Sequence, residues 1–227
     1  MRFGINVFST ASVFVLFAAL SLVFYYNPQL DLVVARYFWT LEDGFFLGDM
    51  GVFRVLYIVF AKISVPIAIL LSLYLLVGVV FGRSNAARFG GFFVRYRVDA
   101  IFLLLLLVLG ALVIEGFFKE VWGRARPRDI LELGGLLEFS PAWVISGQCA
   151  KNCSFMSGHA SFGFYFMALG WVMKNKLWLL PGFILGVALS LTRIVQGGHF
   201  LSDTILTFFV VYLMAQWLSG VFYRVKF

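Results

Sequence analysis

Residues 192–203, TRIVQGGHFLSD, place an arginine, a histidine and an aspartate where one apolar segment ends and the next begins. Five residues separate Arg193 from His199, and three separate His199 from Asp203. If a helix begins at His199, Asp203 lies one turn further along the same face, where its carboxylate can accept a hydrogen bond from one imidazole nitrogen. That bond fixes the tautomer and leaves the other nitrogen's lone pair free to attack. The stretch fits a capped helix start with a boundary histidine equally well.

The composition indicates a membrane protein. Of 227 residues, 62% are hydrophobic and only 13% are charged, whereas soluble domains carry roughly 25% charged residues. One membrane domain, residues 1–227, accounts for the whole length. The net charge of +7 comes from basic residues in short gaps between apolar runs, which membrane topology and anionic ligands explain better than nucleic acid does. The first apolar run is too long for a signal peptide and lacks a small-residue cleavage site.

Six apolar runs reach or approach the roughly 20 residues that a spanning helix needs. They cover residues 5–26, 55–81, 99–118, 155–173, 177–192 and 201–223. Lipid leaves the backbone no other way to satisfy its hydrogen bonds, so each run must be helical. The predicted fold is therefore all-α, a bundle of six transmembrane helices with the active site at the outward helix ends.

Basic residues gather on one side of this layout. They are Arg2 before the first helix; Arg83, Arg88, Arg95 and Arg97 in the second loop; Lys174 and Lys176 in the fourth; and Arg224 and Lys226 after the last helix. The first loop, on the other side, mixes Asp31, Arg36, Glu42, Asp43 and Asp49. The positive-inside rule places both termini in the cytoplasm, and the outward loops then face the periplasm from a bacterial inner membrane. Residues 27–51 and 130–148 are expected to lie on the outer surface.

The outward side gathers the reactive side chains. In KEVWGRARPRD, Lys119 and Arg126 are seven residues apart, two turns along one face if the helix continues to Pro127. The next outward segment, FMSGHA, contributes Ser157, Gly158 and His159. Three helix ends thus bring three cations, both histidines and a carboxylate to one membrane level. This joint occurrence is far more specific than any single piece.

These residue types suit a phosphate monoester or a diphosphate. Arg126 and Arg193 can bind phosphate oxygens in bidentate fashion, and Lys119 adds a point charge. The Ser157 hydroxyl and the Gly158 N–H add donors near a helix N-terminus. One histidine can attack phosphorus while the other protonates the leaving oxygen. No thiolate or carboxylate cluster is placed to hold a metal, so we expect a metal-independent reaction without a cofactor.

The pattern K-x6-RP, SGH and R-x5-H-x3-D, from Lys119 to Asp203, is similar to the three-part signature of the type 2 phosphatidic acid phosphatase superfamily of membrane lipid phosphatases. The resemblance implies that His199 is the nucleophile and forms a phosphohistidine. It implies that Asp203 orients His199, and that His159 serves first as general acid and then as the base that activates water. The implied phosphate-binding residues are Lys119, Arg126, Ser157, Gly158 and Arg193.

Two positions depart from the family pattern. Met156 stands where the family usually has proline, and Thr192 where it usually has serine. Neither supplies reacting atoms, so activity is expected to survive. Within the superfamily, GQCAKNCSFMSGHASFGF and QGGHFLSD resemble bacterial lipid A 4′-phosphatases, which implies lipid A dephosphorylation. Undecaprenyl diphosphate and phosphatidylglycerol phosphate phosphatases share the same core, and a phosphotransferase could use the same phosphohistidine, so these alternatives stay open.

The only two cysteines, Cys149 and Cys153, lie in CAKNC. Their spacing could bind a metal, but no second pair completes a site, and two free thiols are the plain alternative. Because this loop is expected on the oxidising side, we predict a disulfide between them. The expected partners are a phosphorylated lipid and the bilayer, without nucleic acid or an obligate protein partner.

Four charged residues near the signature allow more than one interpretation. Arg124 and Arg128 could contact a second phosphate or lipid headgroups, or anchor the chain at the interface. Lys62, inside the second apolar run, is either a functional residue or a snorkelling side chain. Glu115 precedes Lys119 by four residues, which predicts an ion pair on the helix face.

Overall fold

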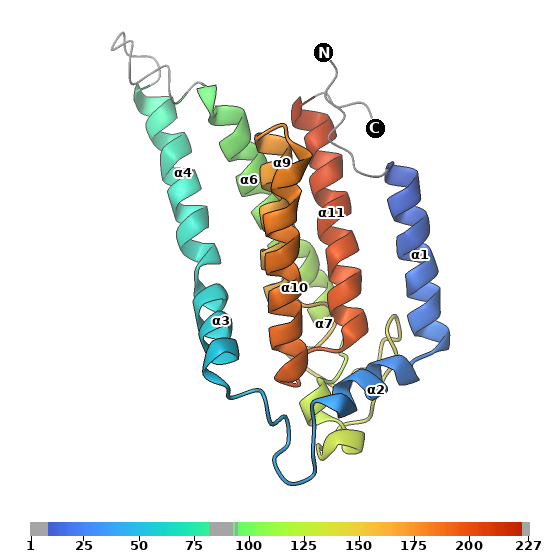
Figure 1. Cartoon of the computed structure of the whole chain (residues 1–227). Helices are drawn as coiled ribbons and strands as arrows, with labels where there is room; N and C mark the ends of the chain where they lie inside the picture. The colour runs from blue at the N-terminus through green and yellow to red at the C-terminus, as the bar shows by residue number, and fades with distance from the viewer. Residues whose placement is uncertain (1–8, 82–92, 94, 224–227) are drawn as a thin grey trace.

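The computed structural model describes residues 9–81, 93 and 95–223 (Figure 1). Arg2, Arg83, Arg88, Arg224 and Lys226, which entered the topology prediction, lie outside the described residues. The longer helices are α1 (Thr10–Tyr26), α2 (Gln29–Tyr37), α3 (Gly51–Lys62), α4 (Ser64–Phe81), α6 (Arg97–Gly110), α10 (Leu179–Val195) and α11 (Leu201–Tyr223). Shorter pieces are η1 (Ala111–Phe118), α7 (Lys119–Trp122), η2 (Pro127–Asp129), η3 (Leu131–Leu133), α8 (Gly158–Tyr165), η4 (Phe166–Ala168), α9 (Leu169–Val172) and η5 (Lys176–Trp178).

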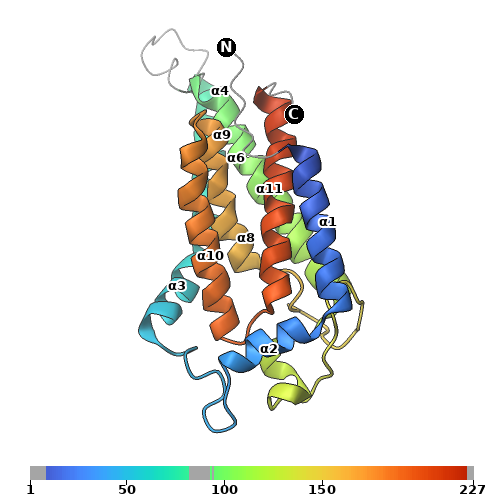
Figure 2. The same ribbon diagram turned by 45° about the vertical axis from the view of Figure 1, so that its right-hand side comes forward.

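The described chain is all-α and crosses the membrane several times. Four helical stretches are long and apolar enough to span a bilayer, and a fifth appears if the bent pair α1 and α2 is counted as one. The four stretches are Gly51–Val80, Arg97–Asp129, Lys176–Val195 and Leu201–Tyr223. The predicted run 155–173 is not one continuous helix, because it is divided into α8, η4 and α9. The start of α1 and the end of α11 lie at the same end of the bundle (Figures 1 and 2).

Helix α8 lies at the centre of the bundle, packed against α10, α11, α6 and α3. All of residues 160–165 are buried, as expected for a short segment whose side chains are mostly apolar all round. A Cβ added at Gly163 would lie 2.6 Å from the Cα of Gly186 in α10. The two glycines therefore let the α8 and α10 backbones approach closely, and this contact fixes the position of the α8 N-terminus.

The third apolar run does not continue as a helix to Pro127. After α6, the eight residues of η1 adopt π-helical geometry, which turns the following residues relative to an α-helix and often occurs at functional sites. Helix α7 then ends at Trp122, because Gly123 adopts a left-handed conformation with φ of 56°. The expectation that Lys119 and Arg126 share one helical face is therefore wrong: Arg126 lies in extended chain beyond the helix.

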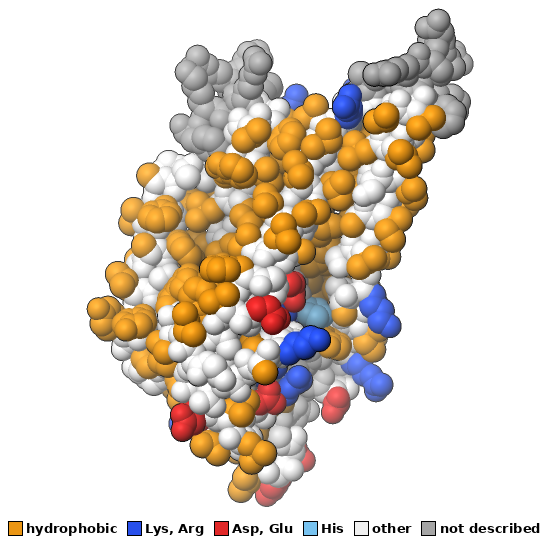
Figure 3. Space-filling view, turned by 180° about the vertical axis from the view of Figure 1, so that it is seen from behind, with side chains coloured by type: hydrophobic (Ala, Val, Ile, Leu, Met, Phe, Trp, Pro, Cys, Tyr) orange, Lys and Arg blue, Asp and Glu red, His pale blue; other side chains and the backbone are white. Residues whose placement is uncertain are grey.

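Irregular segments cover one end of the bundle. Helix α2 is bent by 82° from α1 and lies across this end, together with η2, η3 and the long loop that follows them (Figures 1 and 2). Residues 27–51 and 130–148 thus lie at the end of the bundle, as expected for surface segments. The space-filling view shows apolar side chains spread over the upper part of the visible face, and most of its charged side chains in the lower part, toward the α2 end (Figure 3).

Candidate active site

The turn between α10 and α11 places Arg193 and His199 together. Gly197, with φ of 60°, donates its N–H to Ile194 O at 2.9 Å, and Gly198 donates to Arg193 O at 2.9 Å. This pair of bonds is a Schellman motif, which reverses the chain directly after the helix. A Cβ at Gly198 would collide with the Arg193 guanidinium, so glycine is needed there for the arginine to fold back over the turn.

His199 is buried, with 2% of its surface exposed. Its Nδ1 lies 2.6 Å from the Ser154 carbonyl oxygen, so Nδ1 carries the proton and donates it, and Nε2 keeps its lone pair. Burial lowers the pKa of His199 well below its ordinary value, and the nearby Arg193, Arg126 and Lys119 charges lower it further. The imidazole is therefore neutral near pH 7, which is the protonation state that a nucleophile requires.

Asp203 supports His199 indirectly, through hydrogen bonds to Ser154 and Phe200. Its Oδ2 lies 3.7 Å from His199 Nδ1, too far for the direct hydrogen bond expected from the sequence. Instead Oδ2 accepts from Ser154 Oγ at 2.5 Å and from the Phe200 N–H at 2.8 Å. The second bond closes the first turn of α11 in the manner of a capping box. The carboxylate thus holds Ser154, whose carbonyl orients the imidazole, and Phe200, the next residue after the histidine.

Arg124 is a residue whose role the sequence left open. It is completely buried and is not an interfacial anchor. Its Nη1 lies 2.5 Å from Asp203 Oδ1 and its Nη2 lies 2.7 Å from Asp31 Oδ2. Phe200 packs against the guanidinium, with 4.3 Å between Arg124 Cζ and the ring centre. Asp31 also accepts the N–H of Ser202 at 2.9 Å. One arginine therefore ties α2 and α11 together behind His199.

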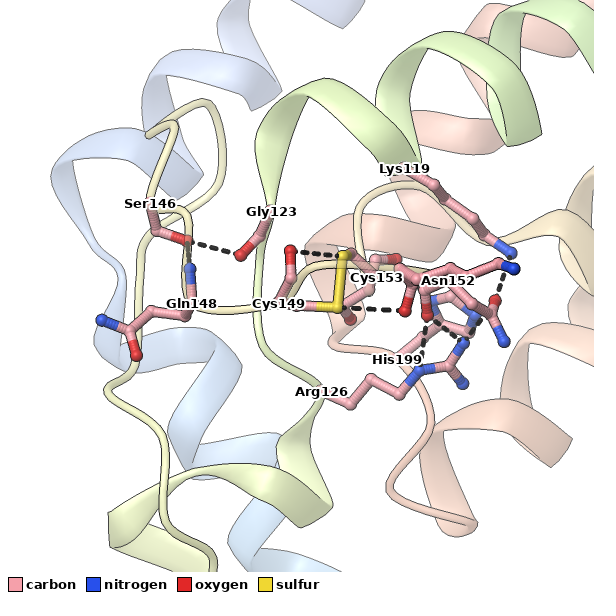
Figure 4. The surroundings of a disulfide bond; sticks show 11 residues. Lys119, Gly123, Arg126, Ser146, Gln148, Cys149, Asn152, Cys153 and His199 are labelled. Atoms are coloured by element: carbon pink, nitrogen blue, oxygen red, sulfur yellow. Dashed lines mark hydrogen bonds between the residues drawn. A yellow bond between two sulfur atoms is a disulfide. The ribbon is translucent and has the colours of Figure 1, made fainter.

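Asn152 holds two of the predicted phosphate-binding cations (Figure 4). Arg126 donates to the Asn152 backbone oxygen at 2.7 Å and to its side-chain Oδ1 at 2.8 Å, and Lys119 Nζ lies 3.4 Å from the same Oδ1. Asn152 lies inside a five-residue loop closed by a disulfide between Cys149 and Cys153. Nothing in the motif pattern marks Asn152 as important; its position between two cysteines is the only signal.

Tyr57 of α3 connects the second histidine to Arg193. The Tyr57 and His159 rings are stacked with centres 4.8 Å apart, and the Arg193 guanidinium lies 4.7 Å from the Tyr57 ring centre. His159 Nε2 and Arg193 Nε are buried without a hydrogen-bond partner among the described residues. Two polar groups thus remain available to a ligand, and the aromatic ring fixes the planes of both side chains.

The remaining predicted residues surround the start of α8. Ser157 is its N-cap, and its Oγ accepts the Ala160 N–H at 3.3 Å. Lys119 pairs with Glu115 at 2.7 Å, as predicted. A Cβ at Gly158 would clash with the Glu115 carboxylate and lie 3.4 Å from Lys119 Nζ. Glycine therefore leaves room for charged groups beside the helix N-terminus.

A cavity of about 420 Å³ leads to this group of residues from the membrane-spanning part of the bundle. Its walls are mostly apolar side chains of α3, α4, α6, α8 and α11, including Phe60, Leu107 and Met214. At one end it reaches Lys119 and His159. Figure 3 shows a histidine in a hollow beside acidic and basic side chains, next to the apolar surface. An amphiphile can therefore place its chains in the cavity and its polar group among the cations.

Several residues prove peripheral to this site. Lys62 is exposed at the end of α3 and does not line the cavity. Arg128 is half exposed and lies 3.8 Å from Asp129. Of the two departures from the family pattern, Met156 is buried in a core cluster, and Thr192 donates its hydroxyl to Ala188 O at 2.8 Å. Both substituted side chains thus face the protein interior.

Across the described residues, no three His, Cys, Asp or Glu side chains form a group that could hold a metal ion.

One end of this membrane-spanning helical fold gathers two histidines, three cations and a buried carboxylate, and this arrangement fits an integral membrane phosphatase. Residues 100–226 match the PAP2 superfamily model, and the chain belongs to this family. The predicted resemblance to type 2 phosphatidic acid phosphatases is confirmed, and the protein is a membrane lipid phosphatase.

The alignments with known relatives cover most of this chain. A lipid A 4′-phosphatase of Francisella tularensis subsp. novicida is 34% identical over 212 residues, which cover 88% of this chain and 89% of that protein. A lipid A 4′-phosphatase of Rhizobium etli is 30% identical over 203 residues, 83% and 77% of the two chains. The crystal structure of a PAP2-type phosphatidylglycerolphosphate phosphatase from Bacillus subtilis aligns with a TM-score of 0.59 at 19% identity, covering 96% of this chain and 97% of that one. The last similarity supports the fold.

Replacing Arg124 tests its role as the link between α2 and α11. Arg124→Met leaves two buried carboxylates without a counter-charge, so the free energy of unfolding in detergent should fall by about 3–5 kcal/mol. Asp31→Asn should cost less, because the Arg124–Asp203 pair remains. Arg128→Met, at a half-exposed position, is the control and should change stability by less than about 0.5 kcal/mol. Equal losses for Arg124→Met and Arg128→Met would contradict this role.

Breaking the disulfide tests whether the 149–153 loop positions Arg126. Cys153→Ser should lower phosphate turnover by up to about 100-fold, because displaced phosphate donors are costly, while stability falls by only about 2 kcal/mol. Asn152→Ala should reproduce the loss of turnover with the disulfide intact. The control is Ala150→Ser, which changes the same loop and keeps both sulfurs. Full turnover by protein whose two thiols are both alkylated would rule the idea out.

Proposed function

We propose that the protein removes a phosphate group from a lipid through a covalent phosphohistidine on His199. The observation that carries the proposal is the state of His199: its Nδ1 is bonded to Ser154, its imidazole is neutral, and three cations surround it. Neutral imidazole is a nucleophile, and the cations Lys119, Arg126 and Arg193 suit the oxygens of a phosphate under attack.

In the first step His199 Nε2 attacks phosphorus and the bond from phosphorus to the lipid oxygen breaks. His159 gives its proton to that oxygen, which leaves as the lipid hydroxyl. The bound phosphate dianion favours the protonated form of His159 before the step. The three cations and the Gly158 N–H stabilise the three equatorial oxygens while phosphorus has five ligands.

In the second step water replaces His199 on phosphorus. His159, now neutral, accepts a proton from the water, whose oxygen attacks phosphorus as the bond to His199 Nε2 breaks. Inorganic phosphate leaves and both imidazoles return to their starting states. Asp203 and Arg124 keep His199 in position during both steps, because they hold Ser154 and the first turn of α11 in place.

Lipid A is the substrate we propose, at its 4′-phosphate. The support comes from relatives named lipid A 4′-phosphatases that match at 30% identity or more over most of the chain. It also comes from the apolar cavity that ends at Lys119 and His159, which can take acyl chains. The cations supplied by the protein suit a reaction without a metal ion.

We further propose six membrane spans: α1, α3 with α4, α6 to α7, α8 to α9, α10, and α11. Both termini then lie in the cytoplasm, and the active site faces the periplasm from the inner membrane of a bacterium. The support is the charge bias. Four of its basic residues belong to the described part of the chain, at the end opposite the candidate site: Arg95, Arg97, Lys174 and Lys176.

Phosphate release from a panel of lipids tests the reaction. Purified protein in excess chelator should dephosphorylate lipid A faster than phosphatidic acid, phosphatidylglycerol phosphate or undecaprenyl diphosphate. His199→Ala should form no acid-labile phosphoenzyme. His159→Ala should turn over lipid A about 10²–10⁴-fold more slowly, yet accumulate phosphoenzyme with 4-nitrophenyl phosphate, whose leaving group needs no proton. A phosphoenzyme on His159, or activity that requires an added divalent ion, would refute the mechanism.

Cysteine labelling tests the orientation. In a background carrying Cys149→Ser and Cys153→Ser, Leu136→Cys introduces a thiol at a position that is 89% exposed at the site end. It should react with a membrane-impermeant reagent in intact spheroplasts. Lys174→Cys, at the opposite end, should react only after permeabilisation. The reverse pattern would place the active site in the cytoplasm.

A further inference from the structure

A second cavity adjoins the candidate active site and shares no lining residue with the apolar one. It has a volume of about 880 Å³ and lies between the loop from α2 to α3, helix α3, and the segments around Arg128 and Gly134. It shares Tyr57 and Arg193 with the candidate active site. Because Tyr57 is stacked on His159, which lines the apolar cavity, one aromatic ring separates the two spaces. We call this second space the outer cavity.

The side chains of the outer cavity offer both donors and acceptors. Arg54, Arg128 and Gln196 can donate hydrogen bonds, Asp43 and Asp49 can accept them, and Trp39 adds an aromatic face. Among the described residues, Arg54, Asp43 and Asp49 have no side-chain ion pair or hydrogen bond within the protein. The two carboxylates repel an anion, so the cavity suits inorganic phosphate alone poorly. The mixture matches a ring that carries several hydroxyl groups and an anionic group.

We propose that the outer cavity binds the saccharide to which the reacting phosphate is esterified. The inference rests on the proposed lipid A phosphatase function and adds a residue set that selects glycolipid phosphates over simple phospholipids. The volume lies within the roughly 300–1,000 Å³ of sites for small organic ligands. Phosphatidic acid has only a glycerol between its phosphate and its acyl chains, and it leaves this cavity to water. A phosphorylated disaccharide lipid fills it and reaches Arg54 and Trp39.

The test compares two substrates in one preparation. The ratio of kcat/KM for bis-phosphorylated lipid A to kcat/KM for dioleoyl phosphatidic acid is measured for the wild type, Arg54→Ala, Trp39→Ala and Arg36→Ala. Arg54→Ala removes hydrogen bonds from a charged donor, so the ratio should fall by about tenfold. Trp39→Ala should lower it in the same direction. Arg36→Ala, an exposed arginine of α2 that does not line the cavity, should leave the ratio unchanged.

An unchanged ratio in both Arg54→Ala and Trp39→Ala overturns the proposal, as does an equal loss on the two substrates. Thermal unfolding of each variant separates lost binding from lost fold, and the more conservative Arg54→Gln gives a second measurement of the same contact. Different results would contradict the proposed function itself. These are phosphate release by His199→Ala, or a wild type that prefers phosphatidic acid to lipid A.

Discussion

The buried guanidinium of Arg124 is the interaction on which the rest of the structure depends. It pairs with Asp31 and Asp203, which lie 93 and 79 residues away in the chain, and all three side chains are excluded from solvent. Burying these charges is costly unless each is paired and hydrogen-bonded. The structure meets that condition with backbone and hydroxyl groups of Ser202, Ser154 and Ser140. Because the pairs join α2 to α11, the surface helix and the candidate catalytic turn cannot move independently.

Around this link, the candidate site is assembled from helix ends. Backbone groups at helix termini lack partners within the helix, and they can orient side chains or bind anions. The Schellman turn after α10 sets Arg193 beside His199, the capping interaction of Asp203 starts α11, and Ser157 starts α8. Local hydrogen bonds therefore fix each piece, and the packing of α8 against α10 brings the pieces together. Arg126 differs, because the Asn152 loop holds it rather than a helix terminus. Lys119 is held by Glu115 one turn earlier and by Asn152.

Much of this arrangement could be predicted from the sequence. The signature residues, the apolar runs and the Glu115–Lys119 pair all follow from local spacing, and the family assignment from the motifs is confirmed. Arg124 could not be interpreted, because its burial results from α2 folding under the bundle, which no local pattern records. The prediction that Lys119 and Arg126 share one helical face was wrong, because the helix ends at Gly123, before it reaches Pro127. The role of Tyr57 could not be predicted, because a single tyrosine in an apolar run most often only packs against its neighbours.

The apolar cavity and the group of cations meet at one level of the bundle. The phosphate of a lipid substrate must therefore lie at this depth in the membrane. In the proposed mechanism the phosphorus atom of a lipid reacts when it reaches His199 while the chains of the same lipid remain in the hydrocarbon. The length of the link between phosphate and chains is then selected together with its chemistry. A water-soluble phosphate ester has no anchor at this depth and must be captured from bulk solution by the cations alone. The bilayer thereby takes part in recognition, since its thickness and surface position decide which phosphates arrive at the reacting level.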